Sequence, residues 1–282
     1  MLTNTFCHVP GIGLQTERAL WSAGIHTWGA LLEGATGDFP LSPRREKTIR
    51  PFLSESRLHL QQGDVRFFAE LLPVEQQWRL FREFRSSVAY LDIETTGMGV
   101  ADDHITAIAL YDGQTVSSYV HGRNLDEFAR DLHRYGIIVT YNGKCFDVPF
   151  IRQSLRIPVE QVQIDLRYVL KSLGYGGGLK ACERKLGIER GDLDGVDGFF
   201  AVLLWDDYAR TGNERAIHTL LAYNAMDVVN LERLMVIAYN RKLEDTPFHP
   251  AHALPLPAMP EIPFHADRNT IESIRHRMLY YT

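Results

Sequence analysis

The sequence predicts an α/β fold: a mixed sheet flanked by helices and preceded by a small all-α module. Three observations support this prediction. Apolar residues recur mostly at helical spacing in the first 85 residues, short β-rich runs begin at residue 86, and the chain reads as almost wholly helical from about residue 166 onward. The change of pattern at residue 86 is therefore a domain boundary in this prediction.

Residues 1–85 are the helical module. Two amphipathic stretches, 42–63 and 64–84, each begin with a Ser or Asp that can cap a helix. Before them, the turn at residues 9–13 resembles the hairpin of helix-hairpin-helix modules, in which backbone N–H groups contact a DNA phosphate. The resemblance implies that Gly11 and Gly13 contact nucleic acid. A sharp turn without such a role is the alternative.

Residues 86–242 are predicted to form the sheet and its helices. Asp112 and Gly113 separate two β-rich runs and are a strong hairpin signal. A meander of three strands followed by alternating helix and strand predicts the mixed sheet. Residues 243–282 are a Pro-rich tail with a candidate terminal helix, and this tail is either an arm that docks on the domain or a mobile linker.

Composition narrows the class of protein. No apolar run is long enough to span a membrane, and the first residues lack the features of a signal peptide, so we expect a cytoplasmic protein without a membrane partner. The three cysteines form no CxxC pair, which argues against a disulfide framework and a zinc site. A formal net charge of −5 argues against a generic basic coat for nucleic acid, although a local patch remains compatible with it.

Two carboxylates lie two residues apart in the run LDIETTG, residues 91–97. Side chains at i and i+2 of a strand share one face, so Asp92 and Glu94 need a positive partner between them, either a Lys or Arg or a divalent metal. No Lys or Arg in the neighbouring stretch offers itself, which favours the metal. Asp147 follows an Asn-Gly turn at the start of a helical run, where it either caps the helix or joins the site.

Asp227 lies in a strongly apolar helical run, where a carboxylate needs a partner. Tyr223 precedes it by four residues and therefore projects from the same side of the helix. Magnesium and manganese prefer oxygen ligands, and two-metal phosphoryl chemistry needs several converging carboxylates. Asp92, Glu94, Asp147 and Asp227 together supply such a cage.

The series LDIETTG, YNGKCFD and YNAMD resembles the three exonuclease motifs of the DEDD superfamily, which has a ribonuclease H-like fold. Tyr223, four residues before Asp227, matches the tyrosine subclass (DEDDy). The chain is especially similar to the YprB-like ribonuclease H-like proteins, in which a segment of the type GLKACERKLGIER separates the second and third motifs. The resemblance covers roughly residues 86–241.

The resemblance implies a metal-dependent 3′-5′ exonuclease that uses two Mg²⁺ or Mn²⁺ ions and acts on single-stranded nucleic acid or a 3′ end. It implies that Asp92, Glu94 and Asp227 surround the first metal, that Asp92 and Asp147 hold the second, and that Tyr223 orients the nucleophilic water. The resemblance also implies that Thr95 and Thr96 contact the terminal nucleotide and that Asn142 positions the loop or touches the substrate sugar. Lys180 and Arg184 are expected to track the phosphates of the strand, because their segment lies between two of the metal-binding motifs.

Several alternatives remain open from the sequence. The same chemistry cuts internally if the groove is open at both ends, which would make the protein an endonuclease. A nucleic-acid-binding protein or scaffold whose acids hold a structural ion is the second alternative. Lys180 and Arg184 are equally compatible with a solvated helix paired with its own Glu183. Asp165, at the end of a strand-like run, is either a supporting acid or a helix cap.

Overall fold

The computed structural model describes residues 1–33, 41–98 and 103–279. Packing divides the chain into two compact units. The first combines Met1–Arg85 with Tyr239–Leu254, and the second combines Ser86–Ala238 with Pro255–Thr282. Each unit is therefore built from two separate stretches of sequence. In the part of the chain that the structure describes, no helix is long and apolar enough to cross a membrane.

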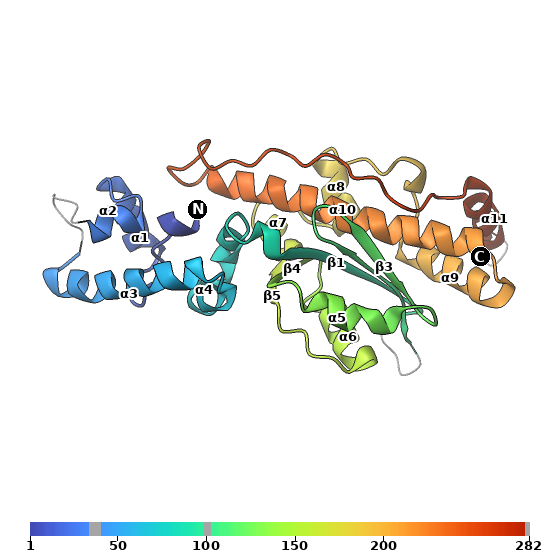
Figure 1. Ribbon diagram of the computed structural model, residues 1–282. Coiled ribbons are helices and arrows are strands. Elements are labelled where there is room, and N and C mark those ends of the chain that lie inside the picture. Colours follow the sequence, from blue (N-terminus) through green and yellow to red (C-terminus); the bar gives the residue numbers. More distant parts are fainter. Residues whose placement is uncertain (34–40, 99–102, 280–282) are drawn as a thin grey trace. The chain divides into compact units, whose positions relative to one another are not determined.

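The first unit is helical, as predicted (Figure 1). Ser42 and Asp64 cap the helices that begin at Pro43 and Val65. The Ser42 hydroxyl accepts a bond from Arg45 N at 3.4 Å, and the Asp64 carboxylate accepts one from Phe67 N at 3.2 Å. The elements are η1 (Leu2–Asn4), α1 (Leu14–Ser22), α2 (Trp28–Leu32), α3 (Pro43–Gln61), α4 (Val65–Leu71), η2 (Val74–Leu80) and, at the boundary, η3 (Arg85–Ser87).

A fully buried ion pair holds the start of the chain within this unit. Arg79 donates to Glu17 over 2.7 Å, and the second carboxylate oxygen of Glu17 accepts the N–H groups of Phe6 and Cys7. Both charged side chains are almost wholly buried, at 4% and 0% exposure. Because both oxygens of Glu17 have donors, the cost of burying its charge is compensated. These bonds also hold Phe6 and Cys7, just before the turn at residues 9–13.

The second unit contains a five-stranded mixed sheet in the order β3-β2-β1-β4-β5. β1 pairs antiparallel with β2 and parallel with β4, which confirms the predicted fold class. Asp112 closes the β2–β3 hairpin, since its carboxylate accepts the N–H groups of Gln114 and Thr115. The strands are β1 (Val88–Thr95), β2 (Ile105–Tyr111), β3 (Val116–Val120), β4 (Ile137–Thr140) and β5 (Val162–Asp165).

Helices cover both faces of this sheet (Figure 1). Leu91 and Ile93 of β1 pack with Phe128 and Ile151 on one face, whereas Ala107 of β2 packs with residues of α9 and α10 on the other. Neighbouring side chains of β2, such as Ala107 and Ile108, thus enter two separate cores. The helical elements are η4 (Leu125–Glu127), α5 (Phe128–Leu132), α6 (Asp147–Leu155), α7 (Leu166–Lys171), α8 (Leu179–Lys185), η5 (Gly191–Leu193), α9 (Gly198–Thr211), α10 (Glu214–Leu243) and α11 (Arg268–Leu279).

The last part of the chain docks on the second unit. Ile271 and Ile274 of α11 are 3% and 1% exposed and belong to the core that α9 and α10 form. The backbone N–H of Asp267 donates to the Thr219 hydroxyl of α10 over 3.0 Å, just before α11 begins. Of the two alternatives left open by the sequence, the docked arm is therefore the one observed for residues 267–274.

Candidate functional site

β1 directs two acids toward α10. Asp92 lies opposite Ala109 of β2, and Glu94 lies opposite Ala107. Directly paired residues of adjacent strands share a face of the sheet, and Ala107 belongs to the core that α9 and α10 cover. The carboxylates therefore project toward α10, and the small alanines beside them leave room for the acidic side chains.

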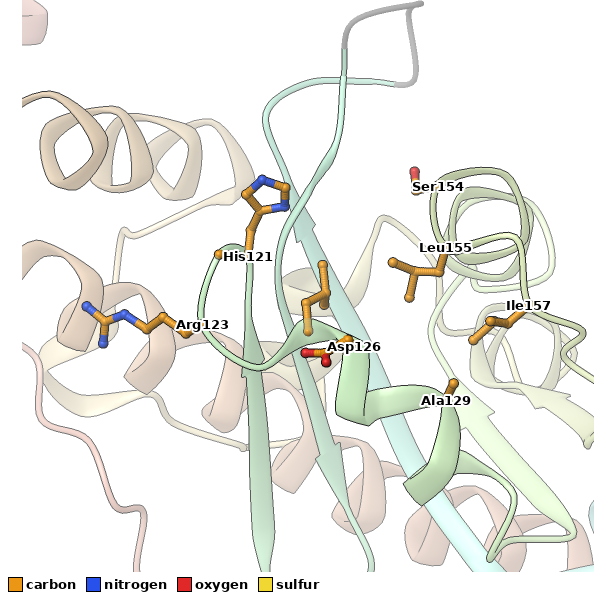
Figure 2. A pocket seen from close by; sticks show the side chains of 9 residues that line it. His121, Arg123, Asp126, Ala129, Ser154, Leu155 and Ile157 are labelled. Carbon is orange, nitrogen blue, oxygen red and sulfur yellow. The ribbon is translucent and has the colours of Figure 1, made fainter.

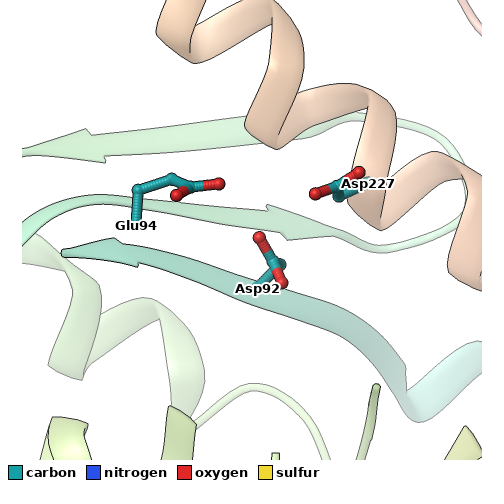
Figure 3. A group of neighbouring side chains, drawn as sticks. All are labelled: Asp92, Glu94 and Asp227. Atoms are coloured by element: carbon teal, nitrogen blue, oxygen red, sulfur yellow. The ribbon is translucent and has the colours of Figure 1, made fainter. Parts of the chain in front are cut away.

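Asp227, on α10, meets them from the opposite side. One oxygen from each of Asp92, Glu94 and Asp227 lies within 4.8 Å of the others. Figure 3 shows the three carboxylates pointing toward one another between strand and helix. Glu94 is 8% exposed and Asp227 is 4% exposed, so the charges are held largely out of water.

Asp147 reaches the same strand from the start of α6. Its carboxylate accepts a 3.2 Å bond from the N–H of Ile93, the residue between the two acids of β1. Asp147 is 3% exposed but is not one of the three residues whose oxygens lie within 4.8 Å of one another. It thus lies beside the acidic cluster, which we define as Asp92, Glu94 and Asp227.

Asp165 shapes the loop that leads to Asp147. Its carboxylate accepts the N–H groups of Asn142 at 2.8 Å, Lys144 at 3.1 Å and Arg167 at 3.0 Å. The last bond caps α7, and the other two fix the loop, so both roles left open by the sequence are observed. Asn142 has a positive φ of 68°, and the Arg167 side chain donates to its amide oxygen. The predicted substrate residue Asn142 is thus held in an uncommon backbone conformation.

The residues around Asp227 on α10 contact the site directly. The Asn224 amide donates to the Asp92 carboxylate over 2.7 Å. The Lys180 ammonium of α8 donates to the Tyr223 hydroxyl over 2.7 Å and lies 4.4 Å from the centre of its ring. Lys180 is half-buried and also bonds the Val196 carbonyl, so it is not part of a freely solvated helix face.

Arg190 is a charged partner of the site that the sequence analysis missed. Its guanidinium, 5% exposed, forms an ion pair with Asp227. Glu183 pairs with this same Arg190 and not with the cations of its own helix. The sequence offered no Lys or Arg in the stretch neighbouring Asp92 and Glu94, and the cation that pairs with Asp227 comes from a distant segment. The missing counter-charge itself was the available signal, since buried acids without a local cation require a remote one.

The remaining predicted contact residues lie outside the acidic cluster. The Thr95 hydroxyl donates to the Gly97 carbonyl over 2.5 Å, and the Thr96 hydroxyl accepts a bond from His104 N. Arg184 is exposed on α8. Gly11 and Gly13 belong to the first unit, where both are exposed and only Gly11 has a positive φ, of 79°. The element before that turn is η1, a three-residue 3₁₀ helix.

Burial and mutual repulsion raise the pKa values of all four acids. The pKa values of Asp92 and Glu94 lie well above the ordinary range, because both groups are desolvated and both face the carboxylate of Asp227. Burial raises the pKa of Asp147 to about 7. Burial also raises the pKa of Asp227, although the Arg190 guanidinium opposes this shift.

These residues fit a hard divalent cation. The donors are carboxylate oxygens, which Mg²⁺ and Mn²⁺ prefer, and a positive ion relieves the repulsion that raises the pKa values. Asp92, Glu94 and Asp227 are close enough to share one ion. Asp147 lies outside this group and is bonded to the N–H of Ile93, between Asp92 and Glu94.

We expect Mn²⁺ affinity to rise with pH. Metal ligands must be deprotonated, and the pKa of Asp147 is about 7. Binding below pH 7 therefore releases protons, and affinity increases about tenfold per pH unit for each proton released.

The raised pKa of Asp147 also affects stability, because the metal-free native state holds a proton on Asp147 that the unfolded chain has lost. Stability without metal therefore falls as pH rises from about 4 through 7. Calorimetric titrations at pH 6, 7 and 8 measure the affinity, and thermal melts at pH 5, 6 and 7 measure the stability. An affinity independent of pH contradicts this expectation.

A separate pocket of about 620 Å³ opens on the other side of the sheet (Figure 2). Leu125, Leu155 and Ile157 line it and pack against the core covered by α5 and α6. Its polar lining includes His121 and Asp126, and none of its lining residues belongs to the acidic cluster. The pocket is therefore distinct from the candidate site.

Comparison with solved structures finds several that are similar to part of this chain. A family B DNA polymerase from the archaeon Pyrobaculum calidifontis is 18% identical over 56% of this chain and 24% of its own, with a TM-score of 0.43. Brucella melitensis NrnC with bound Mg²⁺ is 18% identical over 58% of this chain and 78% of its own, with a TM-score of 0.41. The Aedes aegypti Nibbler EXO domain is 12% identical over 70% and 90%, with a TM-score of 0.38.

The chain thus spans about a quarter of the polymerase chain to which it is similar. No curated protein matches it in sequence. A family model described as the RNase_H superfamily matches residues 89–239, which begin in β1 and end in α10. Because this match covers more than half of the sequence and includes every residue of the acidic cluster, the chain belongs to the RNase H superfamily.

Proposed function

We propose that this protein is a metal-dependent 3′-5′ exonuclease that hydrolyses phosphodiester bonds of DNA or RNA, a DEDDy enzyme of the YprB-like kind. The observation that carries the proposal is the convergence of Asp92, Glu94 and Asp227 within 4.8 Å on an RNase H-superfamily scaffold. Such a set of buried carboxylates holds the cations that a phosphodiester needs at its reaction centre. The 3′-5′ polarity rests on the resemblance of the motifs.

Two Mg²⁺ or Mn²⁺ ions are the proposed cofactors. Asp92, Glu94 and Asp227 hold the first ion, and Asp92 and Asp147 hold the second. When bound, the ions supply Lewis-acid stabilisation of the attacking and leaving oxygens. The surrounding residues keep the carboxylates in place: Asn224 bonds Asp92, and the N–H of Ile93 bonds Asp147.

Tyr223 positions the attacking water. Its pKa is raised because the ring is buried and the neighbouring acids are negative, so the hydroxyl stays protonated and acts as a donor and not as a base. Lys180 donates to the phenol oxygen, which leaves the phenol proton free for the water. Burial lowers the pKa of Lys180, and its ammonium holds Tyr223 in one orientation.

The substrate contacts are assigned to residues around this centre. Thr95 and Thr96 follow the two acids at the end of β1 and contact the terminal nucleotide. Asn142, held by Asp165 and Arg167, contacts the sugar or sets the shape of the loop. Arg184 contributes an exposed charge to the strand path. In the first unit, Gly11 and Gly13 offer exposed backbone to a phosphate.

The proposed enzyme works in the cytoplasm. All three cysteines, Cys7, Cys145 and Cys182, have free thiols, and two of them are buried. Free thiols of this kind are typical of proteins in a reducing compartment.

The test is a cleavage time course on single-stranded DNA and RNA labelled at the 5′ end, with Mn²⁺, with Mg²⁺ and with EDTA. A 3′-5′ exonuclease gives a ladder that shortens from the 3′ end and vanishes with EDTA. The preferred sugar follows from comparing the two strands. Release of the 5′ label as a single nucleotide, without a ladder, contradicts the 3′-5′ polarity.

A circular single strand separates the two alternatives from the proposal. It has no 3′ end, so the exonuclease leaves it intact, whereas an endonuclease on the same fold opens it. A non-catalytic nucleic-acid-binding protein binds the linear strand but cleaves neither substrate with any metal.

A further inference from the structure

Arg190, which lies outside the three motifs, is at the centre of a buried polar network. The network connects Asp227 to Glu183 and Asn230 through hydrogen bonds and ion pairs. Glu183 is 1% exposed and Asn230 is fully buried. Asp227 and Asn230 are three residues apart on α10, so the network leaves this helix and returns to it one turn later.

Glu183 fixes the orientation of the guanidinium. Arg190 donates from Nε over 2.6 Å and from Nη2 over 2.8 Å to the two oxygens of Glu183. Asn230 in turn donates to one of those oxygens over 2.9 Å. A planar guanidinium held by two parallel bonds has one allowed orientation, so its ion pair with Asp227 has a fixed direction.

Glu183 also neutralises the positive charge of Arg190 beside the proposed metal site. An unpaired guanidinium beside Asp227 would compete with a cation for the carboxylate. Paired with Glu183, Arg190 adds no net charge, and the acidic cluster keeps its negative potential while Asp227 has an ion-pair partner. The Arg190 guanidinium also lies 5.6 Å from the ring centre of Tyr223, which fixes the packing of the same turn of α10.

We propose that Arg190, held by Glu183 and Asn230, is a positioning residue that orients the Asp227 carboxylate for metal binding. The inference rests on the proposed function, since it assigns Asp227 to a metal. Hydrogen-bond partners of metal-binding side chains set their orientation, and losing one costs about 10- to 100-fold in metal affinity or activity. Here the partner is an arginine whose charge is cancelled within the network.

A charge-neutral double variant, Arg190→Gln with Glu183→Gln, tests this inference. It removes one positive and one negative charge, so the net charge near Asp227 is unchanged while the guanidinium is lost. Calorimetry with Mn²⁺ is expected to show binding weakened about 10- to 100-fold. The matched control is Lys185→Gln with Glu189→Gln, an exposed pair of charges in the same segment, which is expected to bind like the unaltered protein.

The outcomes separate the inference from the proposed function. Unaltered or tighter binding by the double variant means that the guanidinium only balances charge or competes with the ion, and it overturns the inference. Absence of Mn²⁺ binding by the unaltered protein overturns the proposed function as well. If the double variant does not fold in a thermal melt, Arg190→Lys replaces it. A lysine keeps the charge but cannot bond both Glu183 oxygens and Asp227 in one plane, so weakened binding is again expected, and unchanged binding again overturns the inference.

Discussion

Replacing Asp92 with alanine is expected to lower strand cleavage by about 1,000-fold or more, the upper range of losses when one stabilising group leaves an active site. The metal-free variant is expected to melt at the same temperature as the unaltered protein or above it. Burial and the neighbouring Asp227, Asp147 and Glu94 raise the pKa of Asp92, so its charge is unfavourable in the folded, metal-free state. Cleavage assays in Mn²⁺ and melts in EDTA measure the two effects.

Two controls accompany this variant. Asp126→Ala removes an exposed carboxylate of the same unit and is expected to leave cleavage unchanged. Asp92→Asn keeps an oxygen for the Asn224 amide, so it separates loss of charge from loss of that hydrogen bond. Near-normal cleavage by both Asp92 variants would mean that the acidic cluster is not the catalytic centre.

Truncation after Leu254 is expected to lower the melting temperature of the second unit by roughly 10 °C. It removes α11, in which Ile271 and Ile274 are buried in the core under α9 and α10, and burial of each isoleucine contributes about 1.5–3 kcal/mol. It also removes the backbone donor to Thr219. A melt of the truncated chain, followed by a probe in the second unit, measures the loss.

Point variants show whether the loss comes from the core contact. Ile271→Ala with Ile274→Ala is expected to reproduce most of the drop, because it removes the buried side chains and keeps the chain length. Glu272→Ala, on the exposed side of α11, is expected to change the melting temperature little. A truncated chain that melts like the full one would contradict the docking of α11.

Local patterns account for what the sequence predicted correctly. The hairpin at Asp112 depends on two neighbouring residues, and the mixed sheet follows from a meander succeeded by helix and strand. Asp92 and Glu94 are two residues apart, and side chains two residues apart in a strand lie on the same face of the sheet. Each of these features needs only a few consecutive residues, so a single sequence is sufficient to read them.

Long-range contacts account for what was missed. Arg190 lies far in sequence from Asp227, and no spacing rule connects a loop after α8 with the middle of α10. Glu183 was weighed only against cations of its own helix, because i,i+4 pairing is the pattern a sequence reveals. The bond from Asn224 to Asp92 spans β1 and α10 in the same way. Such partners become visible only when the fold brings the segments together.

The alternation of the chain between its two units sets an order for folding during synthesis. The first unit needs Tyr239–Leu254, and the second needs Pro255 and the residues beyond it. Neither unit is therefore complete until most of the other has been synthesised. Part of the apolar surface of Met1–Arg85 stays exposed while about 150 further residues are added. We expect the first unit to complete its folding only after Leu254 has been synthesised, and chaperones that bind exposed apolar segments can act on Met1–Arg85 during this interval.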